Sequence, residues 1–323
     1  MRRFFLLAAL CAAGFAAAQD SKTFLEANGL EATGTKTLQD VEAVVARVKG
    51  AKDAAAAQER VIVFRGGKPA WQTNSKELVE PTERFTLHSL GRDLDGDGQP
   101  ELHFSGYSGG AHCCTTHYVY RLKPQVKRHA VYQAKNVGGT DFIDIPGRKA
   151  PVMVSADDTS AFVFAPYANS YFPVVILEVS GKGRFQLVQE LMRPQLPGQP
   201  PPVCGQPAAT ANPWLKERCG EFAGAKRKAR TQEIQSKLRE IKSARSADKL
   251  KWDDYVATGV LSAVAAEMNR YAYTGFGAAG LNWLETVWPG NDAIKLTFLE
   301  KLRETRVKSA FADDLRTLST DTR

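Results

Sequence analysis

The chain is 323 residues long and carries a formal net charge of +8, and hydrophobic residues make up 43% of it. This length leaves room for two domains. After the first residues, no stretch approaches the run of about 18 apolar residues that a transmembrane helix needs, so the sequence excludes a protein built from membrane-spanning helices.

Residues 1–18 have the pattern of a secretory signal peptide. Met1-Arg2-Arg3 is positively charged, an apolar segment follows, and Ala16-Ala17-Ala18 matches an A-x-A cleavage site. We therefore expect the mature chain to begin at Gln19 and to be secreted or to reside in the periplasm or cell envelope. Cys11 raises the alternative of a lipoprotein, but the large Leu10 before it favours soluble export.

Residues 19–59 are predicted to form an N-terminal helical segment. Thr37 can cap a short helix that Gly50 would end. Its apolar residues recur at helical spacing; they are Leu38, Val41, Val45 and Val48.

Residues 60–192 are predicted to form an antiparallel β-domain, because short β-prone runs alternate there with Gly, Pro and Asn. The predicted strands are 61–64, 85–90, 101–106, 112–121, 129–133, 142–145, 152–155, 162–165, 174–179 and 185–188.

An acidic loop precedes the third of these strands. Asp93, Asp95 and Asp97 alternate along it, Gly98 allows a sharp bend, and Glu101 delivers a fourth acid into the strand. Hard oxygen ligands of this kind suit calcium. Four acids within nine residues repel one another unless a cation neutralises them. The sequence therefore predicts a calcium site, with an ion-free acidic turn as the alternative.

This loop is shorter than an EF-hand, which would need a Glu at the position of Phe104. It resembles the FG-GAP/VCBS-type repeat of integrin-alpha-like β-propellers. The resemblance implies that Asp93, Asp95, Asp97 and Glu101 are side-chain ligands of calcium and that Gln99 is a carbonyl ligand. A degenerate echo runs from 144 to 153. Because such repeats normally come in sevens, the resemblance does not predict a closed propeller.

All five histidines (88, 103, 112, 117 and 129) fall within the β-domain. One strand cannot chelate a metal alone, because alternate residues point to opposite faces. If 101–106 and 112–121 form a hairpin, His103 faces the side of Cys113 and His117 and completes a three-ligand set for zinc or copper. The alternatives are a structural disulfide with surface histidines, and a redox role for the adjacent cysteines. The tract also resembles a Gly-Gly-Ala-His-Cys-Cys motif of exported bacterial proteins, which implies no known activity.

Export would favour disulfides among the remaining cysteines. The local pairing joins Cys204 to Cys219 and Cys113 to Cys114, although adjacent cysteines make a strained bond. The alternative is cross-pairing of Cys113 and Cys114 with Cys204 and Cys219.

Residues 193–222 are predicted to be a proline-rich connector, since seven of the 16 prolines lie there. Residues 223–323 are predicted to form a basic α-helical domain. Its segment 226–251 holds ten basic and three acidic residues. The candidate surface for an anionic partner is Lys226, Arg227, Lys228 and Arg230. The segment lacks interleaved aromatic residues, which disfavours nucleic acid.

Together these features predict an α+β protein in which an antiparallel β-domain, partly propeller-like or a sandwich, precedes a small helical domain. We expect an exported, calcium-binding envelope protein that acts as a binding or interaction module, with an anionic envelope component or a protein as its partner. A secreted hydrolase with a site near the calcium loop and the His-Cys-Cys segment is the main alternative, and a metal or redox module is another. No common catalytic motif singles out catalytic residues.

Overall fold

A computed structural model describes residues 20–51, 59–109, 114–137, 142–244 and 249–320. Three four-stranded sheets follow one another along the chain, and within each sheet the strands are antiparallel and ordered as in the sequence. The strands are β1 (Leu30–Leu38), β2 (Val41–Val48), β3 (Arg60–Arg65) and β4 (Lys68–Gln72) in the first sheet, β5 (Arg84–Arg92), β6 (Glu101–Tyr107), β7 (Thr115–Arg121) and β8 (Lys127–Lys135) in the second, and β9 (Phe142–Ile143), β10 (Val152–Ala156), β11 (Val174–Val179) and β12 (Phe185–Leu187) in the third.

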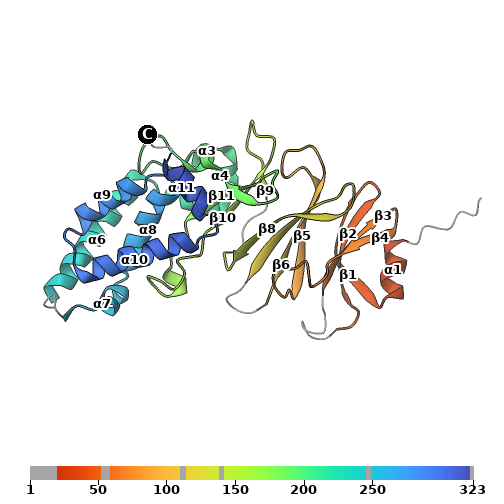
Figure 1. Cartoon of the computed structure of the whole chain (residues 1–323), viewed down its shortest axis with the longest axis horizontal. Coiled ribbons are helices and arrows are strands. Elements are labelled where there is room, and N and C mark those ends of the chain that lie inside the picture. Colours follow the sequence, from red (N-terminus) through yellow and green to blue (C-terminus); the bar gives the residue numbers. More distant parts are fainter. Residues whose placement is uncertain (1–19, 52–58, 110–113, 138–141, 245–248, 321–323) are drawn as a thin grey trace, which may run out of the picture.

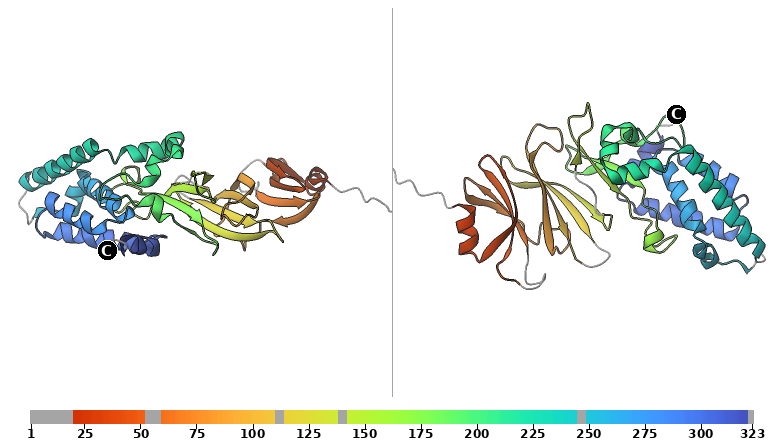
Figure 2. Two further views of the ribbon diagram at one scale, coloured as in Figure 1. Left: turned by 90° about the horizontal axis from the view of Figure 1, so that it is seen from above. Right: turned by 180° about the vertical axis from the view of Figure 1, so that it is seen from behind.

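The sheets stand in a row along the long axis of the molecule, and most of the helices lie beyond the third sheet (Figure 1). Figure 2 shows the same order from above and from behind. The first and second sheets share a core that includes Val63, Phe104 and Tyr118. The other face of the second sheet packs toward the third through Val119 and Tyr132. This arrangement confirms the predicted α+β class, and the described sheets form an open row rather than a ring.

The prediction of a helix between Thr37 and Gly50 is wrong. Those residues form the end of β1, the turn after it and all of β2, and the N-terminal helix α1 is confined to Ser21–Ala27. Val41 and Val45 are four residues apart, which fits one face of a strand as well as one face of a helix. Both faces of β2 are buried, with Val45 in the core beneath the first sheet and Val44 packed against the side of α1. β-branched residues buried on two faces favour a strand.

Most predicted strands of the β-domain are present, with two differences. The segment 162–165 is a turn rather than a strand, because Phe164 is drawn into the helical core beside Trp252 and Phe298. Strand β4, which contains Pro69, was not predicted. As the edge strand of its sheet it can accept a proline.

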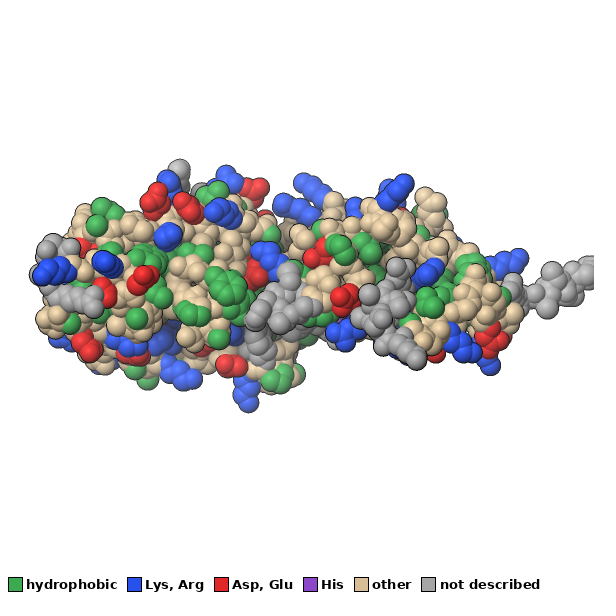
Figure 3. All heavy atoms as spheres, turned by 90° about the horizontal axis from the view of Figure 1, so that it is seen from below, with side chains coloured by type: hydrophobic (Ala, Val, Ile, Leu, Met, Phe, Trp, Pro, Cys, Tyr) green, Lys and Arg blue, Asp and Glu red, His purple; other side chains and the backbone are tan. Residues whose placement is uncertain are grey.

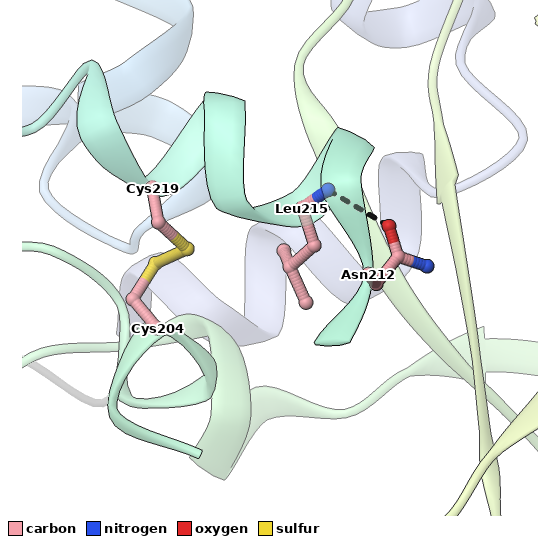
Figure 4. Close-up of a disulfide and its surroundings, with 4 residues drawn as sticks. All are labelled: Cys204, Asn212, Leu215 and Cys219. Atoms are coloured by element: carbon pink, nitrogen blue, oxygen red, sulfur yellow. Dashed lines mark hydrogen bonds between the residues drawn. A yellow bond between two sulfur atoms is a disulfide. The ribbon is translucent and has the colours of Figure 1, made fainter. Parts of the chain in front are cut away.

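The connector is folded rather than extended. It contains the 3-10 turn η2 (Pro202–Gly205) and the short helices α4 (Pro207–Ala211) and α5 (Pro213–Gly220), and the short helix α3 (Gln189–Met192) directly precedes it. Prolines occupy the first turns of α4 and α5, where a missing N–H is harmless. The Asn212 side chain accepts a hydrogen bond from the Leu215 N–H at 2.9 Å, and Cys204 is bonded to Cys219 (Figure 4).

The helical part consists of α6 (Gly224–Ala244), α7 (Trp252–Ala257), α8 (Val260–Tyr273), α9 (Gly277–Val287), α10 (Ala293–Lys308) and α11 (Ala312–Thr320). Its core is aromatic, and Tyr255 stacks on Trp288 with ring centroids 5.4 Å apart. The predicted stripe of Ile234, Leu238 and Ile241 is buried in this core.

The third sheet and the helices share one core. Phe311, just before α11, and Leu318 of α11 pack with the strands of this sheet. A buried polar network reinforces the junction, because Asp157, which follows β10, accepts hydrogen bonds from the hydroxyls of Tyr273, at 2.6 Å, and Ser309. The connector therefore does not separate two independent cores.

Candidate functional site

The acidic loop joins β5 to β6 at one end of the second sheet. Its turn depends on Gly96 and Gly98, whose φ angles of 77° and 84° are rarely adopted by residues with a side chain. The Asp93 carboxylate closes this turn from inside, since it accepts hydrogen bonds from the N–H groups of Gly96 and Gly98 at 2.8 and 2.9 Å. The loop is thus shaped by its own carboxylates.

Three of the predicted ligands converge. Asp93, Asp95 and Glu101 each offer a carboxylate oxygen, and these oxygens lie within 4.8 Å of one another. We call these three residues the acidic cluster. Asp97 lies outside it and is directed to Arg121, whose Nη2 is 2.8 Å from Asp97 Oδ2 and 2.6 Å from Asp95 Oδ2. Gln99 donates its N–H to the Asp97 carboxylate at 2.8 Å.

Glu101 is the buried member of the acidic cluster. It is the first residue of β6 and is 0% exposed. One carboxylate oxygen, Oε2, accepts a hydrogen bond from the Leu94 N–H at 2.7 Å. The other, Oε1, is buried without a hydrogen-bond partner among the described residues. A buried acceptor without a partner destabilises the fold unless a bound ion or water satisfies it.

Burial and neighbouring charges shift the pKa values of the Glu101 and Asp95 carboxyl groups. Burial, together with the charges of Asp95, Asp97 and Asp93, raises the pKa of Glu101 to about 7. Burial alone would raise the pKa of Asp95 too, but the hydrogen bond from Arg121 holds it below its usual value. Arg121 contacts the carboxylates of Asp95 and Asp97, which leaves those of Asp93 and Glu101 without a guanidinium contact among the described residues. The excess of negative charge is the condition under which a bound cation is stabilising.

The corresponding hairpin of the third sheet carries the degenerate echo of this loop. Residues 144–151 join β9 to β10 just as 93–100 join β5 to β6. There Asp144 is exposed and pairs with Arg92, whose Nη2 lies 2.6 Å from its carboxylate. The two loops are neighbours, because a Cβ built on Gly96 would lie 3.4 Å from the Ala150 side chain.

Three histidines gather on the same face of the second sheet. One ring nitrogen from each of His88, His103 and His117 lies within 4.8 Å of the others, and we call these residues the histidine cluster. His103 Nε2 is 3.0 Å from His117 Nδ1, and the rings of His88 and His103 stack with centroids 4.4 Å apart. His88 Nε2 is 2.8 Å from the Ser105 hydroxyl.

The register of the strands explains this assembly. His103 pairs with Val119 and Ser105 with His117, so that His103 and His117 are diagonal neighbours on one face. His88 joins them at an irregularity in the pairing of β5 with β6. The hairpin of β6 and β7 was predicted, but with Cys113 as the third ligand. Cys113 lies outside the described residues, so that set stays a prediction, and the sequence contained no signal for the bulge at His88.

The walls of the histidine cluster are largely apolar. His103 and His117 are each 1% exposed. The Phe142 ring meets His103 edge-on at 5.0 Å, and Tyr132 stacks on His117 at 6.3 Å. Burial, with the nearby charges of His117, His88 and Arg92, lowers the pKa of His103 well below its usual value. His103 is therefore neutral at neutral pH, which is the form that binds metals.

The cysteines of the connector pair locally, as predicted. The bond joins Cys204 to Cys219, whose Cα atoms are 5.5 Å apart, which contradicts cross-pairing with Cys113 or Cys114. Cys114 is disulfide-bonded as well.

The predicted anionic-partner surface is divided by the fold. Lys226 and Lys228 are exposed. Arg227 and Arg230 instead reach the buried Glu267, with hydrogen bonds of 3.2 and 3.3 Å. On the face shown in Figure 3, Lys and Arg side chains lie among Asp and Glu side chains over both parts of the molecule. An anionic partner therefore stays a prediction that rests on Lys226 and Lys228.

Comparison with known proteins adds little to this geometry. No family model and no solved structure matches the chain. The chain is similar to the uncharacterized protein y4bJ of Sinorhizobium fredii (strain NBRC 101917 / NGR234), with 30% identity over 83 residues. The match covers 26% of this chain and 13% of that protein, so the chain spans only a small part of that relative's length. The function therefore has to be inferred from the chemistry of the two clusters.

Proposed function

We propose that this protein is exported and binds calcium through the acidic cluster, and that the ion stabilises its β part as a binding module. The observation that carries the proposal is the buried, unpartnered Oε1 of Glu101 beside the carboxylates of Asp93 and Asp95. A negatively charged acceptor in such a place calls for a cation. Among the described acidic residues of the loop, Arg121 contacts Asp95 and Asp97 and leaves Glu101 unpaired with it.

The dimensions of the acidic cluster support calcium. Calcium binds oxygens at about 2.3–2.6 Å, so two ligands of one ion lie at most about 5 Å apart. The oxygens of Asp93, Asp95 and Glu101 lie within 4.8 Å of one another and meet this limit without rearrangement. Calcium takes six to eight oxygens, and Asp97, the Gln99 carbonyl or water would supply the rest.

The position of the loop supports a stabilising role in a binding module. It lies where the second sheet meets the third, near Ala150, and Arg92 before it pairs with Asp144 of the neighbouring loop. An ion that orders this loop would hold the two sheets in register. The Cys204–Cys219 bond and the signal-like N-terminus support export. In the part of the chain that the structure describes, no helix is long and apolar enough to cross a membrane.

Calcium-dependent thermal stability tests the proposal. Removing calcium from the protein should lower the melting temperature by about 5 °C, because ligand at a hundred times its dissociation constant stabilises a fold by about 2.7 kcal/mol. Asp93→Asn removes one charge from the acidic cluster and should abolish most of this response. Asp144→Asn makes the same change in the neighbouring loop and should leave it intact.

The measurement is a pair of calorimetric scans at matched ionic strength, with calcium and with chelator, for the wild type and both variants. Magnesium in place of calcium controls for unspecific screening by a divalent cation. Identical wild-type scans with calcium and with chelator would mean that the loop is an ion-free acidic turn. An equal loss of response in both variants would move the ion away from the acidic cluster.

A further inference from the structure

We propose that His88, His103 and His117 form a second metal site, which takes a divalent transition metal of the zinc class. This site is distinct from the acidic cluster, although both lie on the same face of β6. Glu101 and His103 are two residues apart on this strand, or about 7 Å at a rise of about 3.3 Å per residue.

The nitrogen positions support this assignment. Zinc binds imidazole nitrogens at about 2.0–2.1 Å, so two ligands of a tetrahedral ion lie about 3.4 Å apart. His103 Nε2 and His117 Nδ1, at 3.0 Å, are already near that separation. The third nitrogen lies within 4.8 Å of both, so it has to approach each of them by at most about 1.4 Å. The movement falls to His88, the least buried of the three.

The rings now stack rather than converge. The planes of His88 and His103 differ by 21°, and those of His103 and His117 by 27°. A metal lies in the plane of each ring that binds it, so binding requires rotation of the His88 ring about its terminal side-chain bond. Torsions of this kind are broad and easily turned. Entry of the metal from the His88 side therefore follows from the geometry.

The surroundings decide the class of metal. Imidazole ligands suit zinc, copper, iron and nickel and do not suit calcium or magnesium. Ser105 contacts His88 Nε2, the kind of hydrogen bond that orients metal-binding histidines. Phe142 and Tyr132 form apolar walls that exclude water from the buried side. Zinc is usually four-coordinate, so the three histidines among the described residues fill three of its positions.

Direct titration with zinc tests this proposal. The probe is ZnCl₂ added to the full chain, prepared without a histidine tag and stripped of metal, and binding is followed by calorimetry. We expect one zinc per chain and a higher melting temperature with zinc. His88→Ala should weaken binding at least about tenfold, since even the partners of zinc ligands contribute this much. As His88 is only half-buried, this variant should fold.

His129→Gln is the matched control, because His129 lies on the same sheet and near Asp95 but outside the histidine cluster. It should bind zinc like the wild type. A second readout is the visible absorption of CoCl₂-loaded protein, which changes with the number of nitrogen ligands and should change in His88→Ala alone. No zinc binding by the wild type, or equal affinity in His88→Ala, would overturn the proposal and leave the three histidines as a packed polar network.

Discussion

The two clusters on the face of β6 differ in how they are built and in what they bind. The acidic cluster offers negatively charged oxygens from one loop and its adjoining strand, within nine residues of sequence. The histidine cluster offers ring nitrogens from three strands and is walled by aromatic rings. One face of one sheet thus holds a hard ligand set beside a softer one. Ligand type rather than shape should decide which ion each takes.

The largest effect that we expect to separate the two clusters is the pH dependence of the free energy of unfolding when no metal ion is bound. Glu101 has a pKa of about 7 in the fold against 4.5 ordinarily, so the folded state holds its proton more tightly than the unfolded state. The protonated Glu101 therefore adds to the free energy of unfolding. This stabilisation is fully present below about pH 4.5 and is lost as the pH rises through 7. At about 1.4 kcal/mol per pKa unit it amounts to about 3.5 kcal/mol.

The buried His103 acts in the opposite sense. Its folded pKa is lowered, so its contribution is present above the ordinary histidine value of 6.5 and is lost as the pH falls. Comparison with Glu101→Gln isolates the acid. In urea titrations with chelator, this variant should exceed the wild type in stability at pH 8 and match it at pH 4.5. With calcium at pH 8, the wild type should instead be more stable than Glu101→Gln. Parallel curves for the two proteins would show that Glu101 is not held at the raised pKa.

The two clusters also differ in how much of them the sequence could predict. Asp93, Asp95 and Glu101 are close in sequence, and Gly96 and Gly98 mark the turn, so local chemistry was enough to place them together. The histidine cluster depends on the register of β6 with β7 and on an irregularity next to Leu87, and both are features of strand pairing that no local sequence signal marks.

The same distinction explains the other errors. Val41 and Val45 fit a helix or a strand equally well by spacing alone, and only their burial on a sheet resolves the choice. Arg227 and Arg230 looked like solvent-exposed charges until Glu267, about 40 residues later, was brought against them. The positions of most strands in the β-domain and the Cys204–Cys219 bond could be predicted because their signals are local.

A second prediction concerns the cation that the acidic cluster already has. Arg121 neutralises part of the negative charge of Asp95 and Asp97. Arg121→Gln should therefore raise calcium affinity by about tenfold, or about 1.4 kcal/mol, the order of one ion pair near a protein surface. The same change should lower the melting temperature in chelator, because the carboxylates lose their counter-charge.

Arg128→Gln is the control for this experiment, because Arg128 donates to the Glu77 carbonyl and makes no contact with the acidic cluster. Calcium titration calorimetry on the three proteins gives the comparison. If Arg121→Gln bound calcium more weakly than the wild type, Arg121 would be a positioning residue for Asp95 and not a competitor of the ion.

The smallest effect is the coupling between the two sites. Two divalent ions about 7 Å apart repel by about 2 kcal/mol in water, which screening at physiological salt reduces to about 1 kcal/mol. Saturating calcium should therefore weaken zinc binding about fivefold, and zinc should weaken calcium binding by the same factor, since coupling free energies are reciprocal. Zinc titrations with and without calcium measure one side of this cycle, and calcium titrations of zinc-loaded protein measure the other. In Glu101→Gln, which has lost the calcium site, added calcium should leave zinc affinity unchanged.

Equal zinc affinities of the wild type with and without calcium would mean that the two ions do not occupy neighbouring positions on β6, and would contradict at least one of the two assignments.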